Sequence, residues 1–292
     1  MANESDLWTV GRMLTWTEQF LSGKGIESPR LEAQILLAHV LGCPRIQLYV
    51  DSERPALDEE RATFRALIKR RVEGEPVAHL VGYREFYKLK FRVSPDVLIP
   101  RPETELLVVE TLTLLKCRPS PKVLDVGTGS GCVALSIAHE HPTAEVTAVD
   151  VSEAALAVAR QNAEDHDLTA RVRFAEGDLF APLSADEQFD VIVSNPPYIA
   201  ADEFAELSPE VAEREPRLAL DGGPDGFDVI RRLVADSRGH LRPDGRLMIE
   251  IGYRQSPVVG PLFADYGFTD VQVLKDNSRQ PRVVTGVVPN PA

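Results

Sequence analysis

The sequence predicts an α/β protein: a seven-stranded, doubly wound sheet with an antiparallel last strand, preceded by a small N-terminal helical domain. From residue 122 onward, short β-branched segments alternate with helical patterns, which is typical of parallel βαβ units. The first 75 residues show helical patterns instead. The length of 292 residues also exceeds the ~100–150 residues of a typical domain, which favours two domains.

The N-terminal domain is expected to span residues 1–75. A helix is predicted from Ser28 to Gly42, because a serine and a first-turn proline precede an apolar run that a glycine closes. A second helix, capped by Asp58, carries its own apolar face. We expect this small domain to be a docking domain, because a single reacting group in the larger domain offers little surface for selectivity.

Residues 76–100 are expected to form a linking β-hairpin. The segment 87–93 alternates the apolar Leu89, Phe91 and Val93 with basic side chains, which is the period of a half-buried strand. Residues 101–292 then form the α/β domain.

The α/β domain contains seven strand candidates. They are 122–126, 145–149, 171–175, 190–194, 245–251, 269–274 and 282–288, with helices expected at 131–141, 152–165 and 225–237. The last two strands are joined by only seven residues, 275–281. A parallel crossover needs about a dozen residues or more, so the final strand is predicted to pair antiparallel.

The composition, 43% hydrophobic and 26% charged, is that of a globular protein. The N-terminus has no apolar signal region, and the longest apolar run, 35–41, is far shorter than the ~20 residues of a membrane span. We therefore expect a cytoplasmic protein with no membrane partner. Cys43, Cys117 and Cys132 are an odd number without a close pair, which favours reduced thiols.

The charge distribution argues against a nucleic-acid substrate. The net charge is −13, and residues 1–100 carry 14 charges of each sign, so all the negative excess lies in residues 101–292. Binding a long nucleic acid depends on Lys and Arg at the phosphates. A direct nucleic-acid substrate is therefore not expected.

A glycine-rich turn follows the first strand of the sheet. Glycines at this position let a ligand reach backbone N–H groups, so a nucleotide-like cofactor is expected here. The NAD fingerprint requires glycine at position 132, which is a cysteine, so a nicotinamide oxidoreductase is disfavoured. The turn residues are Gly127, Thr128, Gly129, Ser130 and Gly131.

Two acidic residues follow the next strands. Asp150 ends the second strand, where a carboxylate can accept hydrogen bonds from ribose hydroxyls. Asp178 follows the third strand and could accept from an adenine amino group, with Leu179 against the ring. The carboxyl ends of successive strands line the crevice in which open α/β sheets bind ligands.

The most specific motif, Asn195-Pro196-Pro197-Tyr198, follows the fourth strand. Its two prolines lack N–H donors and stiffen the loop, so the Asn195 side-chain oxygen and the Pro196 carbonyl remain as acceptors beside the aromatic Tyr198. Such a site can hold a planar NH₂ group, which is a poor nucleophile until its hydrogens are bound and its nitrogen is oriented. An amide or an adenine amino group would fit.

These motifs resemble those of S-adenosylmethionine-dependent amino methyltransferases, and more closely the HemK/PrmC group of protein-(glutamine-N5) methyltransferases. The resemblance extends from about residue 5 to 288. It is carried by GEPVAHLVGYREFYKLKFRVSPDVLIPRPETE (74–105), DVGTGSG (125–131), VSNPPYI (193–199) and EPRLALDGGPDGFD (215–228).

The resemblance implies methyl transfer from S-adenosyl-L-methionine, leaving S-adenosyl-L-homocysteine, to the glutamine of the Gly-Gly-Gln loop of peptide chain release factors. It also implies that the glycine turn, Asp150 and Asn195 bind the cofactor. Residues 195–198 become the substrate loop, with Asn195, Pro196 and Tyr198 catalytic. Two positions depart from the pattern: Leu179 and Arg214 stand where relatives often have aromatic residues.

Other functions are compatible with the same sequence. An adenine-N6 methyltransferase acting on DNA or RNA would present the same kind of amino group, after taking the base out of its stack. A non-catalytic adaptor for a ribosomal factor is a further alternative.

Glu215 is either an acid near the pocket or a structural partner of Arg217. His139-Glu140-His141 is expected to interact with a helix C-terminus, so no metal site is predicted.

Overall fold

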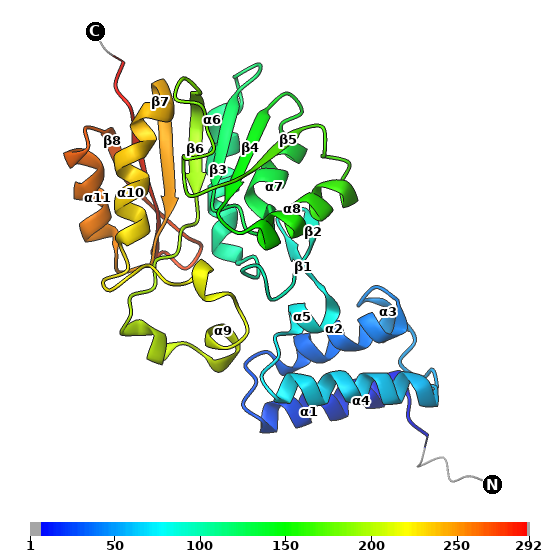
Figure 1. Cartoon of the computed structure of the whole chain (residues 1–292). Helices are drawn as coiled ribbons and strands as arrows, with labels where there is room; N and C mark the ends of the chain where they lie inside the picture. The colour runs from blue at the N-terminus through cyan, green and yellow to red at the C-terminus, as the bar shows by residue number, and fades with distance from the viewer. Residues whose placement is uncertain (1–6, 291–292) are drawn as a thin grey trace. The chain divides into compact units, whose positions relative to one another are not determined.

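The computed structural model describes residues 7–290 (Figure 1) and divides the chain into two compact units, Met1–Gly82 and Tyr83–Ala292. The division falls later than the boundary expected at residue 75. It does so because a short helix, Val77–Val81, packs on the helices before it. Each unit is described separately below.

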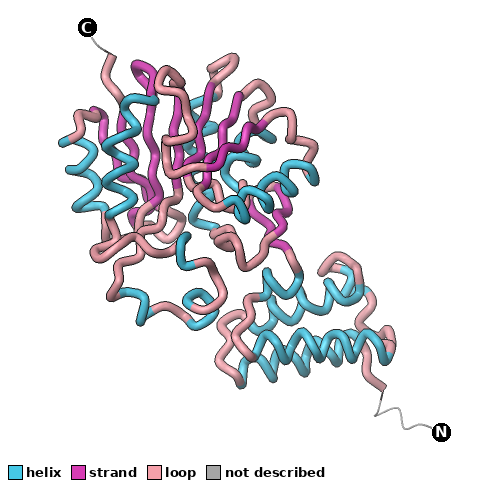
Figure 2. The backbone as a smooth tube through the Cα atoms, viewed as in Figure 1, coloured by secondary structure: helices cyan, strands magenta, loops and turns pink. Residues whose placement is uncertain are grey.

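The described part of the N-terminal unit is helical, as its cyan segments in Figure 2 show. The helices are α1 (Val10–Gly23), α2 (Pro29–Leu41), α3 (Gln47–Val50), α4 (Asp58–Val72) and α5 (Val77–Val81). Helix α2 packs against α1, α4 and α5. Leu21, Leu36 and Phe64 lie in the resulting core.

The ends of α2 and α4 test two sequence predictions. Gly42 adopts the left-handed conformation (φ 60°) as the C-cap of α2, which confirms the predicted helix end. The prediction that Asp58 caps α4 is wrong, since Leu57 is the N-cap residue. The carboxylate of Glu60 accepts a hydrogen bond from the Leu57 N–H at 2.9 Å, so a glutamate three residues inside the helix satisfies this donor.

The hairpin consists of β1 (Tyr83–Phe86) and β2 (Leu89–Arg92), paired antiparallel. The expectation of a strand starting at residue 87 is wrong: Tyr87 lies in the turn with a positive φ of 54°. The predicted apolar alternation holds from Leu89, and Phe86 and Phe91 enter the hydrophobic core of the larger unit. The hairpin therefore belongs to that unit.

The larger unit contains all seven predicted strands. They are β3 (Lys122–Val126), β4 (Glu145–Asp150), β5 (Val172–Glu176), β6 (Phe189–Ser194), β7 (Leu241–Glu250), β8 (Thr269–Lys275) and β9 (Pro281–Val287). The sheet order is β5-β4-β3-β6-β7-β9-β8. Strands β3 to β7 are parallel, and β9 pairs antiparallel with both β7 and β8, which confirms the predicted antiparallel last strand.

Helices cover both faces of this sheet. They are α6 (Glu105–Leu115), α7 (Cys132–Glu140), α8 (Glu153–Asp165), α10 (Asp228–Ser237) and α11 (Ser256–Asp265). Short turns of helix complete the unit: η2 (Pro102–Thr104), η3 (Glu203–Glu206), α9 (Pro209–Ala212), η4 (Arg217–Ala219) and η5 (Arg238–His240).

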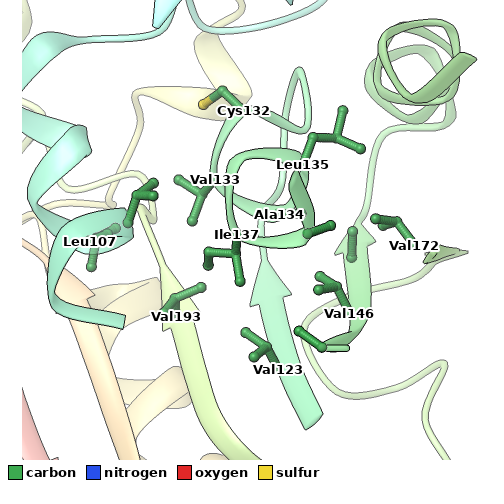
Figure 3. Close-up of a cluster of buried hydrophobic side chains, with 14 of the residues drawn as sticks. Leu107, Val123, Cys132, Val133, Ala134, Leu135, Ile137, Val146, Val172 and Val193 are labelled. Carbon is green, nitrogen blue, oxygen red and sulfur yellow. The ribbon is translucent and has the colours of Figure 1, made fainter. Parts of the chain in front are cut away.

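Successive side chains of each strand point to opposite faces of the sheet, and this divides the core into two layers. Val123 packs on the layer formed by α6 and α7, whereas its neighbour Leu124 packs on the layer formed by α10 and α11. Figure 3 shows the first layer, in which Leu107, Ile137 and Val193 lie between helices and strands. A sheet buried on both faces leaves the ends of its strands as the places for a ligand site.

The cysteines Cys43, Cys117 and Cys132 are free thiols. Within residues 7–290, no helix is both long enough and apolar enough to cross a membrane.

Candidate active site

A cavity of about 370 Å³ opens at the carboxyl ends of β3, β4 and β6. Its volume lies in the ~300–1,000 Å³ range of small-molecule sites. Most residues selected from the sequence line it, including Gly127, Thr128, Gly129, Ser130, Asp150, Asp178, Leu179, Asn195, Pro196 and Pro197. The fold therefore brings together side chains from four strand ends.

The glycine turn is closed against the neighbouring strand. The N–H groups of Gly127 and Thr128 donate to the Val149 carbonyl at 2.8 and 3.0 Å. Gly127, Gly129 and Gly131 have positive φ values of 73°, 56° and 80°, which residues other than glycine rarely adopt. A Cβ atom on Gly129 would meet no atom within 4 Å, so it would project into open space. Because glycine has no Cβ, a ligand can approach the backbone at this position.

Gly131 does not line the cavity. It is the N-cap residue of α7, and a Cβ there would approach Leu135 Cδ1 at 3.0 Å and the Ala159 side chain at 3.2 Å. This glycine therefore permits close packing of α7 and α8 under the turn.

Asp150 ties the glycine turn to the start of α8. One carboxylate oxygen accepts from the Gly129 N–H at 2.8 Å, and the other accepts from the Ser152 N–H at 2.9 Å. Burial raises the pKa of this carboxyl above its usual range, against the lowering effect of these donors. Each oxygen keeps a further lone pair for a ligand hydroxyl.

Asp125 also lines the cavity, although the sequence analysis gave it no role beyond its place in the motif. Its carboxylate accepts from the Thr128 hydroxyl at 2.7 Å and from the Ala134 N–H at 3.2 Å. Burial raises the pKa of Asp125 to about 7. Asp125 therefore links the glycine turn to the first turn of α7 by hydrogen bonds.

Asp178 and Leu179 form the wall beyond β5. Asp178 pairs with Arg232 of α10, with a distance of 2.7 Å between Nη2 and Oδ2. Leu179 has a positive φ of 52° and packs against the hydrophobic layer of α10 and α11. Both residues reach the cavity, where Leu179 supplies an apolar contact.

The Asn195 side chain is held by one hydrogen bond, from Nδ2 to Thr104 Oγ1 at 3.2 Å. Within the described chain, its Oδ1 and the Pro196 carbonyl accept no hydrogen bond. Tyr198 does not line this first cavity. Burial raises the pKa of the Tyr198 phenol, so it stays protonated at neutral pH.

The loop of residues 195–198 is braced by two segments far along the chain. Gln255 Nε2 donates to the carbonyls of Tyr198, at 2.9 Å, and Gly226, at 3.3 Å. A Cβ on Gly222 would lie 2.8 Å from the Tyr198 Cα, so only glycine permits this approach. The motif DGGPDG, noted in the sequence without a role, is therefore the support of this loop.

A second cavity, about 420 Å³ in volume, is also lined by residues of this loop. Tyr198, Tyr253 and Arg254 line it, together with Glu203 and Glu206 of η3. The two cavities share Leu98, Arg101, Asn195, Pro196 and Ala219. A ligand in one cavity and a ligand in the other would therefore both lie next to Asn195 and Pro196.

Glu215 is a structural partner, but not of Arg217. Its carboxylate accepts from the Ile99 N–H at 3.1 Å and pairs with Arg101, whereas Arg217 pairs with Asp221. The expected Glu215–Arg217 ion pair is therefore wrong. Arg101 and Glu215 are 114 residues apart in the sequence, so this ion pair could not be predicted from neighbouring residues.

His139 lies in the last turn of α7, and His141 follows as its C-cap residue, with Nε2 3.2 Å from the Leu115 carbonyl. Among residues 7–290, no group of three His, Cys, Asp or Glu side chains could hold a metal ion.

The sheet order, the antiparallel β9 and the cavity at the glycine turn define an α/β fold of the methyltransferase class. A solved methyltransferase from Pyrococcus furiosus has this fold: it matches 70% of this chain and 90% of its own with a TM-score of 0.52, at 20% identity. Residues 12–82 match the PrmC N-terminal domain family, and residues 103–214 match the methyltransferase small domain family.

Two curated relatives are similar over nearly their whole length. A release factor glutamine methyltransferase from Rhodopirellula baltica is 48% identical over 95% of this chain and 96% of its own. Its counterpart from Geobacter sulfurreducens is 44% identical over 98% and 99%. The chain belongs to the release factor glutamine methyltransferase family.

Proposed function

We propose that this protein transfers a methyl group from S-adenosyl-L-methionine to the side-chain amide nitrogen of the glutamine in the Gly-Gly-Gln loop of peptide chain release factors. Family membership supports this reaction. The observation that carries it is the meeting of two cavities at Asn195 and Pro196, whose oxygens accept no hydrogen bond within the described chain. Because release factors act in translation, we propose a cytoplasmic location.

The first cavity fits the cofactor. Its glycine turn leaves open space at Gly129, where a close approach to the backbone is needed. Asp150 offers carboxylate lone pairs to ribose hydroxyls, and Asp178 and Leu179 offer an acceptor and an apolar surface to adenine. When bound, S-adenosyl-L-methionine supplies a methyl group on a positively charged sulfur.

The second cavity would admit the glutamine. Asn195 Oδ1 and the Pro196 carbonyl then accept the two N–H groups of its amide, with Tyr198 beside it. In the proposed reaction the amide nitrogen would form a bond to the methyl carbon as the carbon–sulfur bond breaks. S-adenosyl-L-homocysteine would remain, and the proton lost by the nitrogen would pass to water. Orientation of the nitrogen is the main contribution of these residues, and such effects reach ~7–11 kcal/mol.

A methyl-transfer assay with labelled S-adenosyl-L-methionine tests this proposal. Intact release factor, the same factor with the loop glutamine changed to alanine, and adenine-containing DNA or RNA are offered side by side. Label is expected on the intact factor alone, because its loop glutamine supplies the NH₂ group and the negative charge of residues 101–292 disfavours a nucleic acid.

The other outcomes separate the alternatives. Label on nucleic acid would assign the loop of residues 195–198 to adenine, against the acidic charge of residues 101–292. Label on the glutamine-less factor would place the modification elsewhere. Absence of label on every substrate would favour an adaptor that only binds.

We further propose that the N-terminal unit, predicted as residues 1–75, docks the release factor. A groove of about 430 Å³ runs between α1 and α4 of this unit. Its wall includes the exposed Trp16 together with Phe20, and Arg65 and Lys69 lie along it. Such a groove suits an apolar segment with acidic neighbours, because aromatic side chains bury well and opposite charges steer association.

Charge reversal in this groove tests the docking proposal. The double variant Arg65→Glu/Lys69→Glu is expected to raise KM for the intact factor about tenfold and leave kcat unchanged, because only the encounter is weakened. Turnover of a short peptide carrying the glutamine loop should not change. Lys116→Glu, an exposed reversal in the other unit, is the matched control. An unchanged KM for the intact factor would remove this groove from the docking surface.

A further inference from the structure

We propose that Arg101 is a specificity-determining residue that donates to the side-chain oxygen of the substrate glutamine, and that Glu215 is the positioning residue that holds it. This inference rests on the proposed function, in which the NH₂ end of the same amide is bound at Asn195 and Pro196. It assigns the other end of the amide, the oxygen, to a side chain that has no role in that function.

Arg101 lies where the two cavities meet. Five residues line both cavities, and Arg101 carries the one charged side chain among these five. Its side chain is 33% exposed, so it is accessible to a ligand. A ligand that reaches Pro196 in either cavity therefore occupies a space that Arg101 also lines.

Glu215 fixes the position of Arg101. The Glu215 side chain is 1% exposed; one carboxylate oxygen accepts from the Ile99 N–H at 3.1 Å, and the other accepts from Arg101 Nη2. Because the carboxylate is anchored to the backbone, it holds the guanidinium in place before a ligand binds. A guanidinium has five N–H donors, and among the described residues Glu215 is the one hydrogen-bond partner of the Arg101 side chain. The remaining donors are available to a ligand.

The amide of a glutamine needs a donor as well as acceptors. Its oxygen loses hydrogen bonds to water when the amide enters a cavity, and a buried acceptor without a partner costs free energy. Pro196 and Pro197 have no N–H groups, so the backbone of the substrate loop can only accept at these two positions. The donor for the amide oxygen must therefore come from another part of the chain.

The other cationic and amide donors of the second cavity are engaged or lie away from the first cavity. Gln255 Nε2 donates to two backbone carbonyls, and Arg282 pairs with Asp276. Arg254 is exposed and lines the second cavity but not the first. Arg101 is therefore the guanidinium best placed for a group that reacts between the two cavities.

The cofactor offers a competing acceptor, because its methionine part carries a carboxylate that would also suit a guanidinium. The first cavity has a donor of its own, however. The Ser130 hydroxyl lines this cavity, Ser130 is 2% exposed, and its oxygen has no hydrogen-bond partner within residues 7–290. We therefore assign Arg101, which lines both cavities, to the ligand of the second one.

With Arg101 on the oxygen, the site recognises both ends of the amide. A glutamate side chain would place an oxygen against the Pro196 carbonyl, and an apolar side chain of the same length would leave the donors of Arg101 unpaired. The hydrogen bond also stabilises negative charge on the amide oxygen as the proton leaves the nitrogen. Arg101 therefore selects glutamine, whereas docking of the whole factor depends on other surfaces.

A double-mutant cycle between Arg101 and the loop glutamine tests this proposal. Calorimetric titration measures the affinity for intact release factor and for the same factor with the glutamine changed to methionine, which has a similar length but no amide. S-adenosyl-L-homocysteine is present, so no methyl transfer occurs. Arg101→Met is expected to lower the ratio of the two affinities about tenfold relative to wild type. Structural damage alone would lower both affinities alike and leave the ratio unchanged.

Two further variants complete the cycle. Arg101→Met leaves Glu215 without its partner, so Arg101→Met/Glu215→Gln removes both charges and keeps an oxygen for the Ile99 N–H. The double variant is expected to lower the ratio by the same factor. Arg254→Met, the matched control, removes a guanidinium that lines the second cavity only, and it should change both affinities alike. A wild-type ratio in Arg101→Met or in the double variant would overturn the proposal.

The affinity for S-adenosyl-L-homocysteine is measured on the same variants and is expected to stay close to wild type. A large loss of this affinity combined with a wild-type ratio would assign Arg101 to the carboxylate of the cofactor and overturn the proposal. Failure of the proposed function would look different: the wild-type protein would bind the two factors alike and transfer no label to the intact one.

Discussion

Replacing Asn195 with alanine is expected to lower kcat by about two orders of magnitude and to leave the affinity for S-adenosyl-L-methionine close to wild type. The substitution removes Oδ1, one of two acceptors proposed to hold the substrate amide against the methyl group, and such preorganised contacts are worth ~10²–10³ in kcat. The cofactor cavity keeps Asp150 and the glycine turn. Single-turnover kinetics and calorimetric titration measure the two quantities.

The control for this variant is Asn277→Ala, which removes an exposed asparagine between β8 and β9. It should leave both kcat and cofactor affinity unchanged. Retained turnover in Asn195→Ala would contradict the role assigned to this side chain. A loss of cofactor affinity as large as the loss of kcat would instead indicate that Asn195 acts mainly on the cofactor side.

Replacing Asp150 with alanine is expected to weaken S-adenosyl-L-methionine binding by about 10- to 100-fold, or ~1.4–2.7 kcal/mol. The substitution leaves the N–H groups of Gly129 and Ser152 without their acceptor and removes the carboxylate proposed for the ribose. At saturating cofactor, kcat should change much less, because Asn195 and Pro196 remain in place. Equilibrium titration with the cofactor measures the effect.

The pH dependence of binding gives a second measure of Asp150. Burial raises the pKa of this carboxyl, and the proposed ribose contact needs its ionised form. Affinity should therefore fall as the pH is lowered through that raised pKa. The matched control is Glu176→Ala, an exposed acid at the end of the neighbouring β5. An Asp150→Ala variant that binds the cofactor like wild type would exclude the proposed contact.

Much of the fold is encoded locally. Strands β3, β4 and β6 were predictable because a strand buried on both faces reads as a short β-branched segment. The antiparallel β9 followed from a connection too short for a crossover. The cofactor-cavity residues were predictable for the same reason: Gly129, Asp150 and Asn195 lie at or just beyond strand ends, and parallel strands bring those ends together.

Short-range contacts that compete with one another were harder to predict. Leu57, and not Asp58, caps α4, because Glu60 reaches back to the Leu57 N–H. Tyr87 lies in a turn, although an alternating pattern could include it. Sequence periodicity does not show which residue begins a helix, and it does not show that the Tyr87 N–H is bound by Glu105, 18 residues further along the chain.

The sheet, its last antiparallel strand, the glycine turn and the loop of residues 195–198 follow from the amino-acid sequence alone. Tertiary contacts determine that Thr104 holds Asn195 and that Gln255 holds Tyr198. They also pair Arg101 with Glu215 at the wall of the two cavities. These partners are separated by 91, 57 and 114 residues. A buried polar group must find a hydrogen-bond partner, but which one it finds depends on how the packed elements bring distant residues into contact.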